Sequence, residues 1–381
     1  MRWSYRIFRV FDIDVRVHAT FFFIVAYFAY AWGTAREPGG IYGAFYGVVL
    51  VLLLFALVVM HELTHSLVAR SFGVGVRDIT LLPIGGMAVM DEMPTEPREE
   101  LLVAVAGPMS NVVVGVVMAA LAPLLIDASL FGDFGRLSDA LLAPGFQGAY
   151  LYLLFVNLML AVFNLLPAFP MDGGRVFRSL LAMRMGRAKA TRVAVGVGQV
   201  LAVALGVLGV FGGGILMVVV AVFIFFGAQA EGKGDEMKGV LEDLRVAQAV
   251  NVGVETARPE QSIGELAARL FHTYQADFPV VSHDGSVLGV VTRDRLISLL
   301  GQHGPEFPVS EAMRVDVPTG GLTDSVYDVF QRMQSSGSRV MPIVEQGRFV
   351  GMVSLEDIGE VFALLSATGP EFAERVPREP R

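Results

Sequence analysis

The sequence contains no cysteine, which excludes disulfide bonds and iron–sulfur clusters without indicating a cellular compartment. Charged residues are also scarce, at 17% of 381 residues, and the formal net charge is −8. This negative charge comes largely from the C-terminal half, which indicates an acidic soluble region and argues against a nucleic-acid partner. Hydrophobic residues make up 54% of the chain and are concentrated in the first 230 residues, which is more than a soluble core requires.

Six apolar runs are long enough to cross a hydrocarbon layer of about 30 Å as helices of about 20 residues. Their composition lacks the alternation that a transmembrane β-barrel requires, so we expect helices in a lipid bilayer. The segment FRVFDIDVRVH, just before the first run, alternates and predicts a short strand at the membrane surface. Because Asp12 and Asp14 precede the first run, we expect it to be retained rather than cleaved as a signal peptide. The predicted spans are residues 18–35, 44–69, 99–126, 149–170, 193–211 and 213–229.

Basic residues between these runs predict the orientation. With six crossings, one side of the membrane carries only Arg36 and Arg136. The positive-inside rule then places the N terminus, and after six crossings the C terminus, on the cytoplasmic side of a plasma or inner membrane. The basic residues on that side are Arg2, Arg6, Arg9, Arg16, Arg70, Arg77, Arg98, Arg175, Arg178, Arg184, Arg187, Lys189 and Arg192.

The second predicted span ends in the five residues HELTH. On a helix, residues four apart share a face, so His61 and His65 can present ring nitrogens to one Zn²⁺. Glu62 lies about 100° round the helix, where it can serve as general base toward an attacking water without binding the metal. HExxH arises by chance in roughly one such sequence in two hundred, and ionisable groups at membrane depth are costly. The pattern therefore favours a catalytic zinc site over a polar cluster packed among helices.

A catalytic zinc site needs a third protein ligand, and Asp172 is the candidate. It follows Pro167 and Pro170, which end the fourth predicted span. Because the second and fourth spans end on the same side of the membrane, Asp172 would reach the depth of the two histidines. Gly173 and Gly174 would let the backbone turn there. The alternative is that Asp172 only caps the next helix.

The motifs of this sequence, and their order along the chain, resemble those of the site-2 protease family. The resemblance is carried by HELTH at 61–65 and NLLPAFPMDGG at 164–174, with AGP at 106–108 and Asn111 between them. More narrowly, the chain resembles the bacterial and archaeal branch that ends in a pair of cystathionine-β-synthase-type (CBS) modules. The expected architecture is a polytopic α-helical membrane domain over residues 1–230, with about six transmembrane helices, followed by a soluble α/β tandem CBS pair.

The resemblance implies a role for each residue of these motifs. His61, His65 and Asp172 would bind one zinc ion per chain, Glu62 would be the general base, and Asn164 would help hold the substrate or the oxyanion. The implied substrate is another membrane protein, cut within or beside its spanning segment. Single-span regulators, anti-sigma factors and remnant signal peptides are the classes that it suggests. The active site would lie near the cytoplasmic face, which agrees with the distribution of basic residues.

Two further features have alternative interpretations. Residues 77–94 contain short β-like runs around Gly85 and Gly86, and a hairpin there would offer an open edge to an extended substrate. An ordinary connecting loop is the other interpretation. Asn157 precedes Asn164 by seven residues and so lies on nearly the same helical face, where it would bind substrate or join helices. For Gly107 of the AGP motif and for the nearby Asn111, we favour a structural role in helix packing.

The chain changes character after residue 230. EGKGDEMKG is charged and contains glycine, and it begins a predicted linker over residues 231–243 that we expect to act as a hinge. Residues 244–366 contain an internal repeat with halves 244–303 and 307–366. Ser262 matches Ser325 at an offset of 63 residues, and FPVV at 278–281 matches MPIV at the same offset. Residues 367–381 are expected to form a disordered tail.

Each half resembles a CBS module, whose pairs commonly bind adenine nucleotides between the halves and often dimerise. Ser354 and Asp357 keep the family's hydroxyl-x-x-Asp spacing, suited to phosphate and ribose hydroxyls. In the first half, Asp294 follows Thr292 by two residues instead of three, and Arg295 occupies the position expected to bind the ribose. This departure puts that nucleotide site in doubt. The pair would therefore either bind ATP or another adenine nucleotide, or serve as a dimerisation module without a ligand. We expect a homodimer through these modules.

Two other functional classes stay open. In a CBS-regulated transporter, the helix broken at Pro167 and Pro170 would form part of a cation path. A transporter does not require HExxH together with an aspartate at the end of another even-numbered span. A proteolytically inert relative that binds membrane proteins would not need the carboxylate of Glu62. The complete set of catalytic residues favours an active protease.

Overall fold

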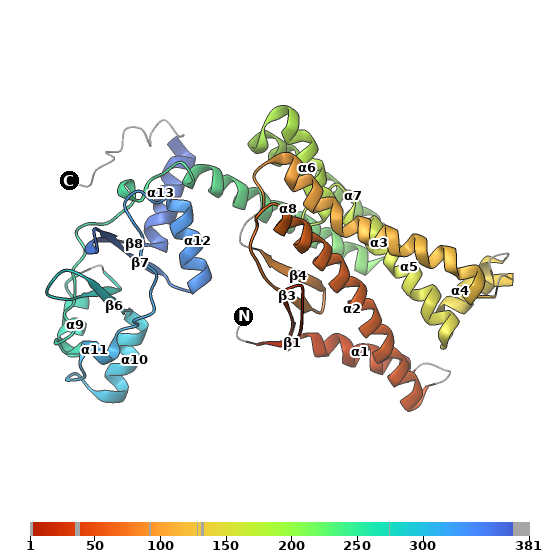
Figure 1. The fold of residues 1–381 in the computed structure, drawn as a ribbon, viewed down its shortest axis with the longest axis horizontal. Coiled ribbons are helices and arrows are strands. Elements are labelled where there is room, and N and C mark those ends of the chain that lie inside the picture. The colour runs from red at the N-terminus through yellow and green to blue at the C-terminus, as the bar shows by residue number, and fades with distance from the viewer. Residues whose placement is uncertain are drawn as a thin grey trace. The chain divides into compact units, whose positions relative to one another are not determined.

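The computed structural model describes residues 3–34, 39–90, 93–127, 129–130, 133–273 and 275–368. The chain divides into two compact units, Met1–Lys233 and Gly234–Arg381 (Figure 1). Residues 369–381 of the expected disordered tail lie outside the described residues, as do Arg2 and Arg36, which were among the basic residues used to predict the orientation.

Within the described residues, five helices are long and apolar enough to cross a membrane, and they correspond to the second to sixth predicted spans. The first predicted span differs: α1 (Phe21–Gly33) has only 13 residues, because the chain before it forms a strand up to His18. Thirteen residues rise only about 20 Å along a helix. The five long helices are α2 (Gly40–Ser71), α3 (Pro97–Leu125), α5 (Phe146–Asn164), α7 (Arg187–Phe211) and α8 (Ile215–Leu241).

Glycines let the first two helices pack closely. A Cβ atom on Gly43 would lie 2.2 Å from the carbonyl oxygen of Trp32, and one on Gly47 would lie 2.4 Å from that of Phe28. The backbones of α1 and α2 therefore pack directly together. The described part of this unit also contains the shorter helices α4 (Phe134–Leu142) and α6 (Asp172–Met185).

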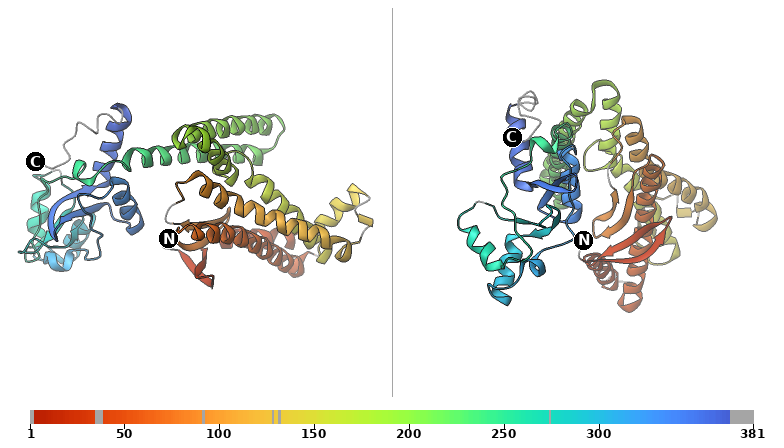
Figure 2. Two further views of the ribbon diagram at one scale, coloured as in Figure 1. Left: turned by 45° about the horizontal axis from the view of Figure 1, so that its top comes forward. Right: turned by 60° about the vertical axis from the view of Figure 1, so that its left-hand side comes forward.

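A four-stranded sheet lies where α1 begins and α2 ends (Figures 1 and 2). The surface strand predicted before the first span is a hairpin of two strands, and the predicted hairpin around Gly85 and Gly86 is confirmed. Strand β2 runs parallel to β3, and the outer pairs are antiparallel. Within the described residues, β4 pairs with β3 alone. The strands, in spatial order, are β1 (Ser4–Val10), β2 (Ile13–His18), β3 (Val76–Leu82) and β4 (Gly85–Met90).

The segment predicted as a hinge is helical over most of its length. Residues 231–241 are the last turns of α8, and irregular backbone is limited to the residues just after Leu241. A glycine inside a helix costs only about 1 kcal/mol, so packing can override it. Leu241 is fully buried in the core of the second unit, together with Leu244 and Val246 of the short 3₁₀ helix η2 (Val246–Gln248).

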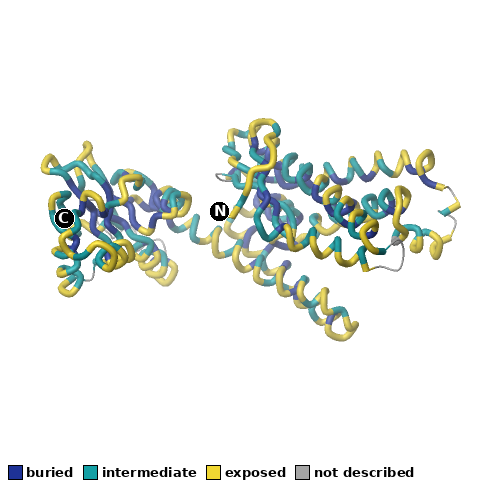
Figure 3. The backbone as a smooth tube through the Cα atoms, turned by 90° about the horizontal axis from the view of Figure 1, so that it is seen from below, coloured by how far each residue is buried: buried dark blue, intermediate teal, exposed yellow. Residues whose placement is uncertain are grey.

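The second unit contains the predicted repeat and has two apolar cores. One combines residues of the second half with Leu244 and Val246, and the other combines residues of the first half with Val309 and Ala312. Ser262 and Ser325 match in the repeat because both cap helices: each hydroxyl accepts a backbone N–H of the first turn, at 3.2 and 3.1 Å. All four residues of FPVV at 278–281 are buried, and Figure 3 shows buried backbone inside the second unit. The elements are α9 (Ile263–Leu270), β5 (Phe278–Val281), β6 (Val287–Val291), α10 (Arg293–His303), α11 (Val309–Ala312), α12 (Val326–Ser336), β7 (Val340–Glu345), β8 (Arg348–Ser354) and α13 (Leu355–Thr368).

Candidate active site

The two histidines of HELTH face the interior of the first unit from α2. Nε2 of His61 and Nε2 of His65 are 3.1 Å apart, and both side chains are buried. Oδ2 of Asp172 lies 3.1 Å from the first nitrogen and 3.2 Å from the second. Asp172 is the first residue of α6, whose N-cap is Met171, so its side chain meets the histidines instead of capping the helix. In the described part of the chain, no other group of His, Cys, Asp or Glu side chains converges in this way.

These three atoms fit a zinc ion. In a tetrahedral site with zinc–nitrogen bonds of about 2.0–2.1 Å, neighbouring ligand atoms are about 3.3 Å apart. The nearly equal separations match one face of such a tetrahedron and leave the fourth position open. Nδ1 of His65 lies 2.7 Å from the carbonyl oxygen of Val103, which can only accept a hydrogen bond. In the neutral ring, Nε2 therefore directs a lone pair toward the Asp172 carboxylate, an arrangement that a cation between them would satisfy.

Electrostatics keep Asp172 available as a ligand. Burial acts to raise the pKa of its carboxyl, but without a metal ion the rings of His61 and His65 can carry a proton on Nε2, and their hydrogen bonds to the carboxylate outweigh burial and hold the pKa well below its usual value. The side chain is therefore an anion, the form that binds a metal.

Gly107 of α3 lies directly against the pair of histidines. A Cβ atom there would be 2.1 Å from Nε2 of His65 and 2.7 Å from Cε1 of His61. Only glycine therefore lets α3 pass this face of α2. This gives the AGP motif a specific function beyond general helix packing.

The hairpin lies over the candidate general base. A Cβ atom on Gly86 would be 2.7 Å from Cγ of Glu62 and 3.1 Å from Cγ1 of Val58, so β4 passes close above α2. Gly85 opens the strand at φ +143°, a conformation that favours glycine. The fold thus brings Glu62, Gly85 and Gly86 together beside the three candidate ligands.

The two asparagines of α5 have different positions. Asn164 is the last residue of the helix, is partly exposed, and leads into the loop that ends at Asp172. Asn157 is fully buried and donates from Nδ2 to the carbonyl oxygen of Asn111 at 2.7 Å. This hydrogen bond joins α5 to α3, as expected of a residue that links helices. A substrate contact by Asn157 stays a prediction.

The residues proposed for a nucleotide in the second unit lie at the starts of helices, and two of them cap a helix. Ser354 donates to Oδ2 of Asp357 from its hydroxyl at 2.7 Å and from its backbone N–H at 2.8 Å, and its oxygen accepts the Asp357 N–H at 3.0 Å. This is a capping box at the start of α13. Thr292 is the N-cap of α10 without a side-chain capping bond. Arg295, in the departing half, donates to the carbonyl oxygen of Ala312 at 2.5 Å.

Sequence reasoning missed the residues that surround the candidate ligands. Val103 contributes only a backbone carbonyl, which no side-chain pattern reveals. Glu100 and Arg178 form a buried ion pair between α3 and α6. Arg178 was predicted only to be one of the basic residues on the cytoplasmic side. The sequence does not show that its side chain is buried, so no sequence signal distinguished it from the other arginines.

Comparison with known proteins identifies both units. Residues 49–208 match the model of peptidase family M50, and residues 246–302 and 309–363 each match the CBS domain. A zinc metalloprotease of Methanocaldococcus jannaschii is 32% identical over 366 residues, covering 96% of this chain and 98% of the relative. A CBS domain-containing protein of Bacillus subtilis is 34% identical over 117 residues, covering 30% of this chain and 81% of the relative. The solved site-2 protease of M. jannaschii is 33% identical, with a TM-score of 0.43, and the match covers 60% of this chain and 95% of that one. The chain therefore belongs to peptidase family M50, the site-2 protease family of zinc metalloproteases, and carries a tandem pair of CBS domains.

Proposed function

We propose that this zinc metalloprotease cleaves other membrane proteins within or beside a spanning segment. The observation that carries the proposal is the placement of His61 and His65 on α2, a helix of 32 residues that is apolar enough to cross a membrane. Together with Asp172, they would hold one zinc ion per chain. A peptidase site built into such a helix meets substrates in the bilayer.

The residues of the site have separate tasks in peptide hydrolysis. The zinc ion, when bound, would supply Lewis-acid activation of water and of the scissile carbonyl. Glu62 would accept a proton from the attacking water as the carbon–oxygen bond forms. It would then pass that proton to the leaving nitrogen as the carbon–nitrogen bond breaks. Asn164, at the end of α5, would hydrogen-bond the substrate backbone or the oxyanion.

The open edge of β4 would bind the substrate in an extended form. Helical peptide bonds are shielded by their own hydrogen bonds, so a substrate must unwind before cleavage. The backbone of an unwound segment would pair with β4 by strand addition. Gly86 supports this role because it brings β4 against Glu62, which would place the paired segment beside the general base.

We further propose that the N terminus, the active site and the CBS pair face the cytoplasm of a cell membrane. The distribution of basic residues supports this orientation. Substrates would be single-span regulators, anti-sigma factors or remnant signal peptides.

For the CBS pair, we propose an adenine nucleotide ligand that modulates proteolysis, and dimerisation of the chain. Ser354 and Asp357 support a single nucleotide site, in the second half. Their capping box favours the alternative of a packing module, because both side chains already satisfy each other.

One substitution tests the proteolytic proposal against a transporter or an inert binder. With purified protein and a single-span substrate in liposomes, Glu62→Gln should retain zinc and reduce cleavage by at least about 100-fold, the usual contribution of a general base. A transporter or an inert binder would show no cleavage even in the parent protein, with Glu62 in place. Undiminished cleavage by Glu62→Gln would refute the role of Glu62. Proteomics of cells with either form would then identify the membrane proteins that accumulate.

A further inference from the structure

A cluster of charged side chains connects four helices of the first unit. Glu100 of α3 and Arg178 of α6 form its centre, and their side chains are only 1% and 2% exposed. Arg178 donates to Oε1 of Glu100 from Nε at 2.9 Å and also from Nη2. Arg187 of α7 donates to Oε2 of Glu100 at 3.3 Å, and Nη1 of Arg178 donates to Glu231 of α8 at 3.2 Å. One carboxylate and one guanidinium thus hold α6 against its neighbours (Figure 1).

Arg178 also contacts the loop that carries Asp172. Its Cζ atom lies 5.0 Å from the centroid of the Phe169 ring, which is fully buried three residues before Asp172. The backbone between them has little room to move. A Cβ atom on Gly174 would lie 2.6 Å from the backbone nitrogen of Phe169, and one on Gly173 would lie 2.3 Å from the carbonyl oxygen of Leu165. The position of the Phe169 ring therefore helps to set the position of the Asp172 carboxylate.

Glu100 acts on the opposite side of the candidate zinc site. It lies on α3, one helical turn before Val103, whose carbonyl oxygen orients the ring of His65. Two turns after Glu100, Gly107 lies against the same ring. A rotation or shift of α3 would move both contacts. The ion pair therefore connects the helix that orients His65 to the helix that carries Asp172.

A buried ion pair is a poor device for stability alone. Desolvation of the two charges offsets much of their attraction, and apolar residues of similar volume often stabilise a protein equally well. What arginine contributes is geometry: Nε and Nη2 of one planar guanidinium both donate to Oε1 of Glu100, Nη1 donates to Glu231, and the same group lies over the Phe169 ring. Lysine keeps the charge but cannot form all of these contacts at once.

We propose that Arg178, paired with Glu100, is a positioning residue that fixes Asp172 relative to His65 for zinc binding. The proposal rests on the zinc ligands named under the proposed function. It assigns Arg178 no contact with the metal or the substrate. Its effect is transmitted through Phe169 on one side and through α3 on the other.

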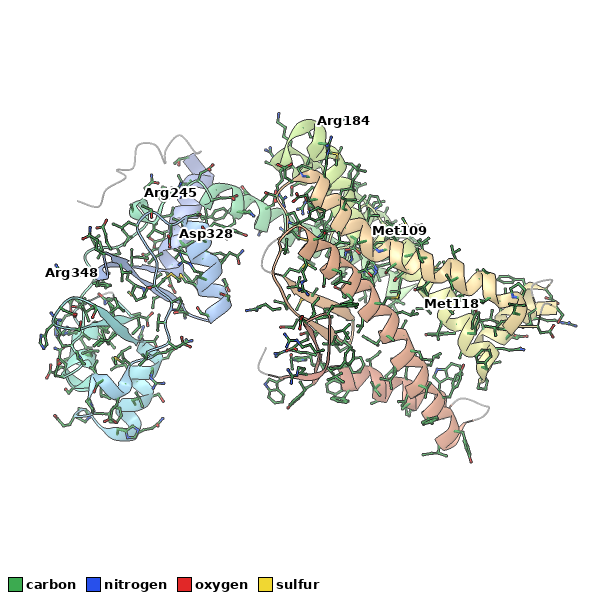
Figure 4. The ribbon with its side chains drawn as sticks, viewed as in Figure 1. Met109, Met118, Arg184, Arg245, Asp328 and Arg348 are labelled. Carbon is green, nitrogen blue, oxygen red and sulfur yellow. The ribbon has the colours of Figure 1, made fainter. Side chains whose placement is uncertain are left out.

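Three variants of the full chain, purified in detergent, test this proposal. Arg178→Lys keeps the positive charge but lacks the planar guanidinium. The double variant Glu100→Gln with Arg178→Gln removes both charges and leaves the net charge of the cluster unchanged. Arg184→Gln is the matched control, because Arg184 lies on the same helix with an exposed side chain (Figure 4). The readouts are the zinc Kd from competition with a chelator, the absorption spectrum of the cobalt-loaded protein, and the melting temperature of the metal-free protein.

Loss of the positioning contact should raise the zinc Kd by about 10- to 100-fold, as substitutions around metal ligands typically do. Arg178→Lys and the double variant should both show this rise with an altered cobalt spectrum, and Arg184→Gln should match the parent. Unchanged zinc affinity and an unchanged spectrum, with only a lower melting temperature, would mean that the ion pair serves stability alone and would overturn the proposal. If neither variant folds, the cluster is a folding requirement and the positioning role is likewise rejected.

A failure of the proposed function looks different. In that case the parent protein itself would either bind no zinc at the site of His61, His65 and Asp172, or bind zinc without cleaving a membrane substrate, whatever residue stands at position 178.

Discussion

A Cβ atom on Gly107 would lie 2.1 Å from Nε2 of His65, so α3 passes the candidate zinc-binding face of α2 without room for a side chain. Gly107→Ala should therefore displace the His65 ring and lower zinc content severalfold or more. Metal analysis of the purified protein measures this loss.

Gly206→Ala is the control for that substitution. Gly206 also lies in a long apolar helix, α7, but its Cβ atom would meet Ala221 at an ordinary contact distance of 3.5 Å. Alanine is the better helix former, so this variant should keep its zinc and be slightly more stable. Full zinc content in Gly107→Ala would show that the histidines can move aside at no cost to binding.

Removal of the metal should destabilise the protein through His61, His65 and Asp172. A ligand that binds only the folded state at about 100 times its Kd contributes about 2.7 kcal/mol to the free energy of unfolding. A chelator should therefore lower the melting temperature of the parent chain. In Asp172→Asn and His65→Ala, which lack a full ligand set, the chelator should have little effect. An equal shift in these variants would place the metal elsewhere.

The edge of β4 can be tested at Ala88. In an antiparallel pair that starts at the two-residue turn Pro83–Ile84, alternate residues point their backbone N–H groups away from the partner strand, and Ala88 is one of them. Proline there removes the outward N–H and leaves the β3 pairing intact. Ala88→Pro should reduce cleavage of a membrane substrate several-fold with full zinc content.

Met87→Ala serves as the comparison for Ala88→Pro, because it changes an exposed side chain on the same strand without altering the backbone. It should cleave at nearly the parent rate. Equal rates for the proline variant and the parent would rule out strand addition at this edge.

Nucleotide binding to the CBS pair has a thermodynamic signature. ATP, ADP or AMP at millimolar concentration should raise the melting temperature of the full chain if it binds the folded state. Ser354→Ala should abolish that shift and, through loss of the capping box, cost about 0.5–2 kcal/mol of stability. No shift in the parent with any adenine nucleotide would assign the pair to dimerisation and packing.

Much of the site follows from local sequence rules. A helix places residues four apart on one face, so HELTH by itself puts His61 beside His65. The length of each apolar run predicted five of the spans. The offset of 63 residues between Ser262 and Ser325 predicted a repeat, because the same capping position recurs in each half. Residues 231–241 of the predicted linker are helical, because packing around Leu241 outweighs the helix-breaking tendency of glycine, and the two units divide within them, at Lys233 and Gly234.

Contacts between segments that are distant in the sequence could not be predicted from such local rules. HELTH and the aspartate motif determined which residue types could bind zinc, because that choice depends on side-chain chemistry and local spacing. Only the tertiary structure decided that Asp172 reaches both histidines, that Val103 orients His65, that β4 passes over Glu62, and that Glu100 and Arg178 are buried together. These depend on how α3 and α6 pack against α2, and helix packing is set by the sum of many weak contacts that no short stretch of sequence contains.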